Sequence, residues 1–219
     1  MRYRDRRDAG EQLAARLRYL RGHHPLVLGM PRGGVLVAGE IADTLAAPLD
    51  VLLTREIHAP SHPEIVVGAV GESGVVVTEH RVVRDLGLSG DEFTEAANRE
   101  RAELARQAAV YHRVRHPHPV GGQVVVLVDD GVTTGSPARA AIRVLRARGV
   151  GHLVFAVPVG PLGVLDDLAR SVDRLVCPRP LRWMHAVKNS YQDFRRIGDE
   201  EVLTLLGAEH PGSIAAPSH

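Results

Sequence analysis

Short runs of apolar residues alternate with amphipathic segments along most of this chain. The run Val124–Val128 has no polar alternation, so we expect a central strand that is buried on both faces. Similar apolar runs predict further strands at residues 26–30, 49–53, 65–70, 74–78, 153–158 and 174–177. Strands that alternate with helices predict an α/β fold with a mostly parallel central sheet flanked by helices.

Helices are predicted where apolar residues recur at helical spacing or where capping residues stand. Asp8 and Glu11 have the spacing of a capping box, ahead of apolar Leu13, Leu17 and Leu20. The other predicted helices cover residues 34–46, residues 89 to about 111, a segment that begins near Pro137, and a segment after Pro161. Residues 71–74 are expected to form a hairpin-like turn between two strands.

Composition and charge narrow the class of protein. The chain has 219 residues, 44% of them apolar, and a net charge of +1, which gives no argument for nucleic-acid binding. No apolar run reaches membrane-spanning length and no apolar signal region opens the chain, so we expect a soluble, cytoplasmic protein without a membrane partner. The single cysteine, Cys177, allows no internal disulfide and is expected to be a buried structural thiol.

Histidine pairs and a basic segment also suggest sites, but each has a simpler interpretation. His23, His24, His116 and His118 have no cysteine or acidic partner at ligand spacing, so we expect solvated loop histidines rather than a metal centre. The arginines of residues 99–113 are interspersed with glutamates, which predicts an ion-paired helix face rather than a nucleic-acid surface.

Two adjacent carboxylates, Asp129 and Asp130, directly follow the apolar run Val124–Val128. A turn and then a helix come next, and the first turn of a helix has unpaired N–H groups and a positive dipole end that favour phosphate. The turn residues expected to bind phosphate are Gly131, Val132, Thr133, Thr134, Gly135 and Ser136. A ribose diol with a magnesium ion nearby would separate the carboxylates from that phosphate. The alternative is a polar turn that binds nothing.

A second turn, with Arg32, Gly33 and Gly34, also follows a predicted strand and begins a helix. The glycines permit a close backbone approach, and Arg32 supplies a fixed cationic fork. Because ligands of parallel sheets bind at the carboxyl ends of strands, this turn is expected at the same sheet edge as Asp129. The alternative is a helix entry with an exposed arginine.

The sequence DDGVTTGS, residues 129–136, resembles the 5-phosphoribosyl-1-pyrophosphate (PRPP) motif of type I phosphoribosyltransferases. The resemblance implies that Asp129 and Asp130 hold the ribose hydroxyls and that residues 131–136 cradle the 5′-phosphate. It further implies that Arg32, Gly33 and Gly34 contact the leaving pyrophosphate. Pro137 stands where the family usually has Ser or Thr, so one phosphate donor is lost.

Residues 53–72 and 191–202 resemble a narrower, uncharacterised group of predicted phosphoribosyltransferases. Residues 53–72 occupy the place of the flexible catalytic loop of that fold, and their Gly, Pro, Ser and His content predicts a mobile loop. Glu56 replaces the usual Lys and reverses a charge, whereas Arg55 is expected to reach the leaving group. The later segment includes YQDF, residues 191–194, and DEEV, residues 199–202.

The resemblance implies one domain, residues 1–206, with a core at about 22–178 and a small hood from terminal segments, mainly 179–206. Residues 207–219 are expected to be a disordered tail. In the hood, Trp183 or Tyr191 is a candidate to stack on a planar acceptor; the alternative for each is hood packing.

The expected reaction is transfer of the phosphoribosyl group from PRPP to a nitrogenous acceptor, a purine-like base, with release of pyrophosphate. Arg55, Asp129 and Asp130 are the candidate catalytic residues, and both aspartates would hold Mg²⁺ indirectly through PRPP. A homodimer is the expectation for the fold. The alternative function is a PRPP- or nucleotide-binding regulator that does not catalyse, suggested by Glu56 and Pro137.

Overall fold

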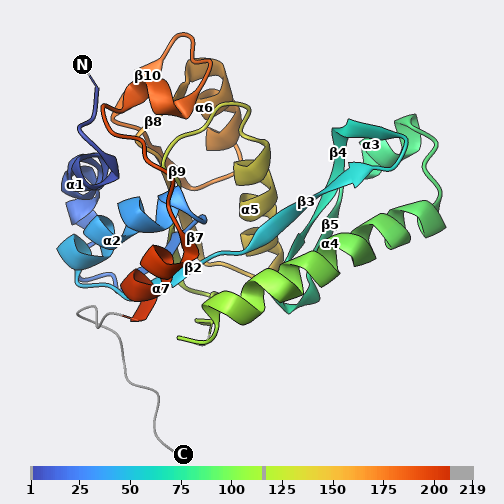
Figure 1. The fold of residues 1–219 in the computed structure, drawn as a ribbon, viewed down its shortest axis with the longest axis horizontal. Coiled ribbons are helices and arrows are strands. Elements are labelled where there is room, and N and C mark those ends of the chain that lie inside the picture. Colours follow the sequence, from blue (N-terminus) through green and yellow to red (C-terminus); the bar gives the residue numbers. More distant parts are fainter. Residues whose placement is uncertain (1, 115–116, 208–219) are drawn as a thin grey trace, which may run out of the picture.

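A five-stranded parallel sheet forms the centre of the body in the computed structural model, which describes residues 2–114 and 117–207 (Figure 1). Its strand order is β2-β1-β6-β7-β9. The strands are β1 (Leu26–Gly29), β2 (Leu49–Val51), β6 (Val124–Val128), β7 (His152–Ala156) and β9 (Arg174–Val176). The predicted α/β class with a parallel central sheet is confirmed.

Helices cover both faces of this sheet, as its uninterrupted apolar strands require. Val126 and Val128 of β6 pack in the cluster that includes α1 (Arg6–Leu17) and α2 (Gly33–Leu45). Val125 and Leu127 point to the opposite side, toward α5 (Ser136–Ala147) and α6 (Leu162–Ala169). Alternate residues of β6 therefore pack against the helical layers on the two faces of the sheet.

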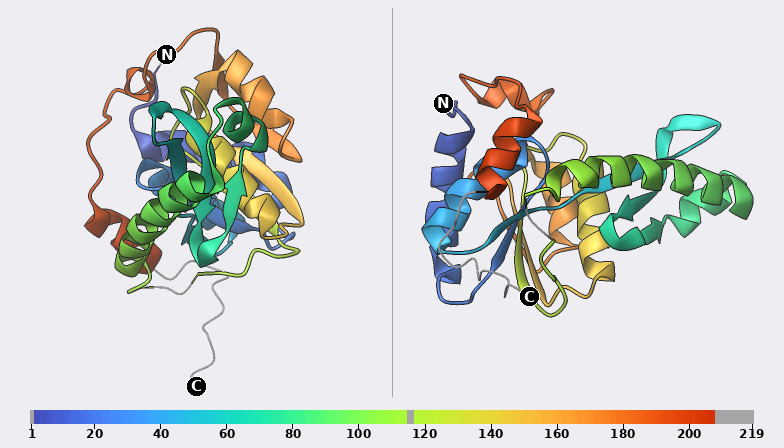
Figure 2. Two further views of the ribbon diagram at one scale, coloured as in Figure 1. Left: turned by 90° about the vertical axis from the view of Figure 1, so that its right-hand side faces the viewer. Right: turned by 60° about the horizontal axis from the view of Figure 1, so that its bottom comes forward.

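An arm projects from the body in Figure 1 and in the right-hand view of Figure 2. It consists of the antiparallel strands β3 (Thr54–Ala59), β4 (His62–Gly71) and β5 (Val76–Thr78), the short helices η2 (Glu72–Gly74) and α3 (His80–Asp85), and the long helix α4 (Gly90–Tyr111). The turn predicted between β4 and β5 is confirmed.

The prediction of a mobile loop at residues 53–72 is wrong, because β3 and β4 pair from Thr54↔Gly71 to Ala59↔His62. Ile57, Val67 and Val70 are buried in the same core cluster as residues of α4, which fixes the hairpin. The Pro, Ser and His residues that suggested a loop are concentrated where the chain reverses, around residues 58–63.

Most predicted helix boundaries agree with the structure, with one exception at the start of the chain. Ser89 and Glu92 form the predicted capping box of α4, and Pro137 lies in the first turn of α5. Helix α1 begins earlier than predicted, since the side chain of Asp5, not Asp8, caps it by accepting from the Asp8 N–H. The capping box at Asp8 and Glu11 was therefore wrong, although the apolar face of the helix is buried as expected.

The C-terminal part of the chain returns over the carboxyl ends of the strands. β8 (Val159–Pro161) pairs in parallel with β10 (Arg179–Leu181), followed by η3 (Val187–Ser190) and α7 (Asp199–Gly207). Tyr3, ahead of α1 and the short helix η1 (Arg18–Leu20), forms a parallel bridge with Tyr191. Both ends of the described chain thus contribute to the hood. The predicted tail from 208 to 219 lies outside the described residues.

Three smaller predictions have mixed outcomes. Burial raises the pKa of the half-buried Cys177 thiol to about 11, which fits a structural role. His23 and His24 are exposed as predicted, but His118 is not a solvated loop residue: its Nδ1 lies 3.0 Å from Oδ2 of the buried Asp50. His116 lies outside the described residues.

Ion pairs such as Arg99–Glu95 confirm the predicted charged face of α4. None of the helices that the structure describes is long and apolar enough to cross a membrane.

Candidate functional site

The candidate site lies where the strand order changes direction, between β1 and β6. Gly29 is in register with Val128, and the Met30 N–H donates to the Val128 carbonyl oxygen at 2.8 Å. The two turns that follow these strands therefore leave the sheet side by side. In parallel sheets this is the position at which a crevice for ligands forms.

Gly33 and Gly34 allow the two turns to touch. A Cβ on Gly33 would lie 1.9 Å from Oδ2 of Asp130, and one on Gly34 would lie 2.6 Å from the Val128 carbonyl oxygen. No other residue type fits such gaps without displacement. The prediction that the Arg32-Gly33-Gly34 turn lies at the same edge as Asp129 is confirmed.

Asp129 and Asp130 differ in their partners. The Asp130 N–H donates to Oδ1 of Asp129 at 2.8 Å, and Arg6 lies with its Nε 2.7 Å from Oδ2 of Asp130. Burial, and then the charge of Asp130, raise the pKa of Asp129 well above its usual range. Burial also raises the pKa of Asp130, but Arg6 opposes that shift. Asp129 is therefore the carboxyl that holds a proton more readily, and Asp130 is the one stabilised as an anion.

No sequence pattern indicates the role of Arg6, because it stands among other charged residues. In the structure its guanidinium lies 3.8 Å from the centre of the Phe194 ring, and its Nη1 donates to the Arg195 carbonyl oxygen at 3.0 Å. Arg6 thus links α1, the second aspartate and residues 193–197, which we call the strap.

Tyr191 supports the same aspartate from the backbone side. Its ring is 2% exposed and packs against Tyr3 and Phe194, and its hydroxyl donates to the Asp130 carbonyl oxygen at 2.5 Å. The geometry favours the hood-packing alternative for Tyr191 over a stacking surface. Trp183, the other candidate, is 82% exposed and does not line the cleft beside the aspartates.

The predicted phosphate turn leads directly into the first turn of α5, as expected. Gly135 caps α5 with a φ of +73°, a left-handed conformation that glycine adopts without strain. Arg139, one turn into α5, donates to the Thr134 carbonyl oxygen at 2.8 Å and pairs with Asp167 at 2.7 Å. Sequence reasoning did not identify Arg139.

Not every residue of that turn is equally free to receive a ligand. The Val132 N–H already donates to the Val159 carbonyl oxygen at 3.0 Å, and the Val132 side chain is buried. A Cβ on Gly131 would lie 2.5 Å from Cγ1 of Val187, so this glycine also packs beneath the hood. Thr133, Thr134, Gly135 and Ser136 are the part of the predicted set that is available to a phosphate.

A cleft of about 620 Å³ opens beside the two aspartates. Its walls come from α1, the Arg32 turn, α4 and the strap, and the lining residues are Arg6, Pro31, Arg32, Gly33, Gln107, Asp129, Asp130, Phe194, Arg195, Arg196 and Ile197. Two carboxylates at one end of a cleft with four arginines suit a ligand that carries hydroxyls as well as strong negative charge.

Residues 5–176 match the family model described as "Phosphoribosyl transferase domain". The chain belongs to the phosphoribosyltransferase family. A protein of Mycobacterium tuberculosis H37Rv, provisionally named a phosphoribosyl transferase, is 42% identical over 206 residues, which are 94% of this chain and 46% of that protein. The chain therefore spans about half the length of the curated relatives it matches.

Two further comparisons extend this family assignment. The crystal structure of TT1426 from Thermus thermophilus is 40% identical and has a TM-score of 0.88, covering 94% of this chain and 98% of that one. A ribose-phosphate pyrophosphokinase of Methanopyrus kandleri is 31% identical over an alignment of 140 positions that covers 53% of this chain and 46% of that protein. The family match spans both turns at the sheet edge but ends before the strap.

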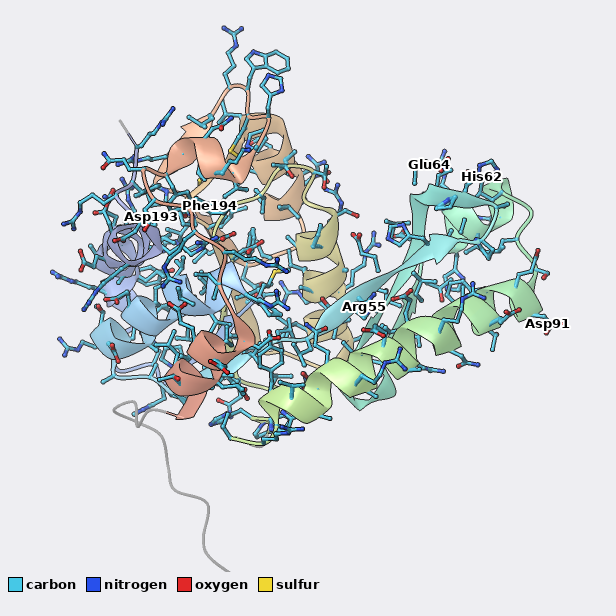
Figure 3. All side chains as sticks on the ribbon, viewed as in Figure 1. Arg55, His62, Glu64, Asp91, Asp193 and Phe194 are labelled. Atoms are coloured by element: carbon cyan, nitrogen blue, oxygen red, sulfur yellow. The ribbon has the colours of Figure 1, made fainter. Side chains whose placement is uncertain are left out.

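Two arginines expected at the pyrophosphate of this family member have carboxylate partners. Arg32 Nε lies 2.8 Å from Oδ1 of Asp199, which also accepts from the Tyr111 hydroxyl at 2.6 Å. Arg55 Nε lies 2.6 Å from Oε2 of Glu100 on α4. Figure 3 shows Arg55 at the root of the arm, apart from Phe194 of the strap. The structure brings Arg32 to the aspartates but does not bring Arg55 into the cleft.

Glu56 follows Arg55 in β3, so its side chain points to the other face of the arm. One of its carboxylate oxygens, Oε1, is buried without a hydrogen-bond partner among the described residues. Glu56 stands where the resembled group usually has Lys, so this position adds no positive charge to the site.

The aspartate pair fits a magnesium ion only with help from a ligand. Within residues 2–114 and 117–207 no group of three or more His, Cys, Asp or Glu side chains is arranged to hold a metal. Mg²⁺ is commonly held by one or two carboxylates together with substrate phosphates and water. Asp129 and Asp130 match that incomplete protein set.

Proposed function

We propose that the protein transfers the 5-phosphoribosyl group from PRPP to a nitrogenous, purine-like base and releases pyrophosphate. The observation that carries this proposal is the contact between the Gly33 turn and Asp130, which joins a phosphate-type turn, a carboxylate pair and an arginine turn at one sheet edge. The similarity to a ribose-phosphate pyrophosphokinase supports a ribose-phosphate ligand.

Each part of PRPP has a matching part of the site. Asp129 and Asp130 would accept hydrogen bonds from the ribose hydroxyls, and N–H and hydroxyl groups of residues 133–136 would bind the 5′-phosphate. Arg32 and the backbone of Gly33 and Gly34 would face the pyrophosphate. Arg32 would then exchange its partner Asp199 for the substrate.

The chemistry needs charge stabilisation rather than a side-chain nucleophile. Breaking the C1′–O bond leaves positive charge on the ribose and negative charge on pyrophosphate. Magnesium, when bound with PRPP, supplies positive charge at the departing phosphates. Asp130, whose anionic form Arg6 favours, would oppose the positive charge on the ribose.

Calorimetric titration with PRPP and magnesium tests the binding step. Wild-type protein is expected to bind, and Asp129→Asn with Asp130→Asn is expected to lose binding while a thermal melt still shows a folded protein. Unchanged PRPP affinity in that double variant would contradict the ribose role. A pyrophosphate-release assay across purine and pyrimidine bases then identifies the acceptor.

A PRPP- or nucleotide-binding regulator without turnover is the second candidate. The observation that favours it is the pairing of Arg55 with Glu100, together with the acidic Glu56, which leaves these two arm positions without a free cation for the leaving group. PRPP binding without pyrophosphate release on any base would support this candidate. The expected homodimer and cytoplasmic location belong to either proposal; light scattering on purified protein checks the dimer.

A further inference from the structure

The cleft contains four guanidinium groups among its described residues, and three of them already have a carboxylate partner. Arg6 pairs with Asp130, Arg32 with Asp199, and Arg195 forms a double contact with Glu201. These ion pairs reduce the positive charge that the three arginines offer to an incoming ligand.

Arg196 is different, because it lines the cleft without an ion pair or hydrogen bond to any residue that the structure describes. Its side chain is exposed, so its charge is hydrated by solvent. Among the guanidinium groups of the described cleft, it is the one whose charge is not already compensated.

The strap that carries Arg196 separates two hollows and is fixed at several points. Asp193 lines a neighbouring groove of about 520 Å³, whereas Phe194 and Arg196 line the cleft. The Asp193 N–H donates to the Arg4 carbonyl oxygen at 2.8 Å, and Phe194 lies under Arg6. In Figure 3, Asp193 and Phe194 lie at the level of α1 and above α2. The strap backbone that carries Arg196 is therefore held in place, so ligand binding needs to order only the Arg196 side chain.

An uncompensated guanidinium in this cleft would attract the most negatively charged group of the ligand. The cleft is shared by Arg32, Gly33 and the aspartates, so a pyrophosphate placed at the Arg32 turn would lie in the same space. We propose that Arg196 is a catalytic residue that binds the leaving pyrophosphate. This proposal rests on the proposed function. It assigns to the hood the positive charge for the leaving group, which neither the acidic Glu56 nor the paired Arg55 supplies from the arm.

In this step the C1′–O bond breaks, and its electron pair stays on the pyrophosphate oxygen. The acceptor nitrogen forms the new C1′–N bond and releases its proton to water. Arg196 donates hydrogen bonds to the departing oxygens through its guanidinium N–H groups. Its contribution therefore grows as negative charge accumulates on the leaving group.

The test compares three ligands on wild type, Arg196→Gln and Arg182→Gln. Arg182 is an exposed hood arginine outside the cleft, so its substitution controls for loss of general positive charge. Calorimetry with magnesium is run with PRPP, pyrophosphate and ribose 5-phosphate. In Arg196→Gln the affinities for PRPP and pyrophosphate are expected to fall about tenfold or more, the size of a charged hydrogen bond. Ribose 5-phosphate binding is expected to stay unchanged, and Arg182→Gln is expected to match wild type.

Other outcomes overturn the proposal. Unchanged PRPP and pyrophosphate affinity in Arg196→Gln refutes it, as does an equal loss for all three ligands, which would indicate a structural role. If ribose 5-phosphate affinity falls while pyrophosphate affinity is unchanged, the cation binds the 5′-phosphate and not pyrophosphate. If wild type itself binds no PRPP, the proposed function fails, a result that is distinguishable because it requires no variant. Arg196→Lys is expected to restore part of the pyrophosphate affinity.

Discussion

Arg6 and Asp130 stand 124 positions apart in the sequence and meet with Nε 2.7 Å from Oδ2. Both side chains are largely buried, so neither charge is well hydrated. The ion pair favours the anionic form of Asp130 against the effect of burial, and it links the first helix to the carboxyl end of the central strand. Because it lines the cleft, we expect it to affect both folding and ligand binding.

Replacing Arg6 by Gln is expected to lower the free energy of unfolding by about 3 kcal/mol, because removal of one partner leaves a buried charge uncompensated. PRPP affinity is expected to fall in parallel. Urea unfolding measures the first effect and calorimetry the second. Adding Asp130→Asn to Arg6→Gln is expected to recover part of the lost stability, and a strictly additive double variant would show that the two side chains are not coupled.

Asp129→Asn is expected to raise the melting temperature at neutral pH. The pKa of Asp129 is raised in the folded protein by burial and by Asp130, so its contribution to stability is complete below the pKa of an unfolded aspartate, near 3.9, and is lost as pH rises through the folded pKa. Asparagine keeps an oxygen that can accept the Asp130 N–H. The gain, about 2–4 °C per kcal/mol recovered, is expected to be present at pH 7–8 and to vanish near pH 4. Scanning calorimetry in magnesium-free buffer gives the comparison; a gain that grows toward low pH contradicts it.

Gly33→Ala is expected to destabilise the protein and weaken PRPP binding, because the new methyl group would lie 1.9 Å from Oδ2 of Asp130. The turn would have to move away from the aspartates. Gly163→Ala in α6 is the matched control, since a Cβ there meets nothing within 4 Å and alanine favours a helix by about 0.5–1 kcal/mol. Gly33→Ala is expected to melt at a lower temperature and to bind PRPP more weakly, whereas Gly163→Ala is expected to melt slightly higher with unchanged PRPP affinity.

Asp199→Asn is expected to increase PRPP affinity by up to about fivefold, the equivalent of the roughly 1 kcal/mol that an exposed ion pair contributes. Asp199 holds Arg32 at 2.8 Å, and the substitution releases that guanidinium for the pyrophosphate. Stability is expected to change little. Glu200→Gln, one residue along the same helix and outside the cleft, is the control for the lost negative charge. A decrease in PRPP affinity at low salt would show that Asp199 positions Arg32 rather than competing for it.

Local sequence patterns were sufficient for the sheet and for the two turns at its edge. Val124–Val128 and residues 26–30 are short, apolar and flanked by turn residues, and the parallel order of their strands brings the Asp129 and Gly33 turns together. Ser89 with Glu92 fixed the start of α4 because a capping box is a local contact. These features depend on neighbours in the chain, which a sequence displays directly.

The rest of the site depends on contacts between distant segments. Arg6, Tyr191 and the strap meet only after the chain has closed the hood, and none of them stands in a motif that points to the others. The arm was misjudged for a related reason: Pro and His residues at its tip suggested a loop, whereas burial of Ile57 and Val70 against α4 decided for a hairpin. Arg55 was assigned to the leaving group, but a glutamate 45 residues away pairs with it.

The bridge between Tyr3 and Tyr191 joins a residue that is synthesised among the first to one that follows the whole central sheet. All five strands of the central sheet are synthesised by residue 176, whereas the strap leaves the ribosome later. Until it does, Asp130 lacks the Tyr191 hydroxyl on its carbonyl, and Arg6 has no aromatic ring beneath it. A nascent chain can therefore complete its central sheet while its cleft still lacks one wall, and the cleft is closed only after the strap has been synthesised.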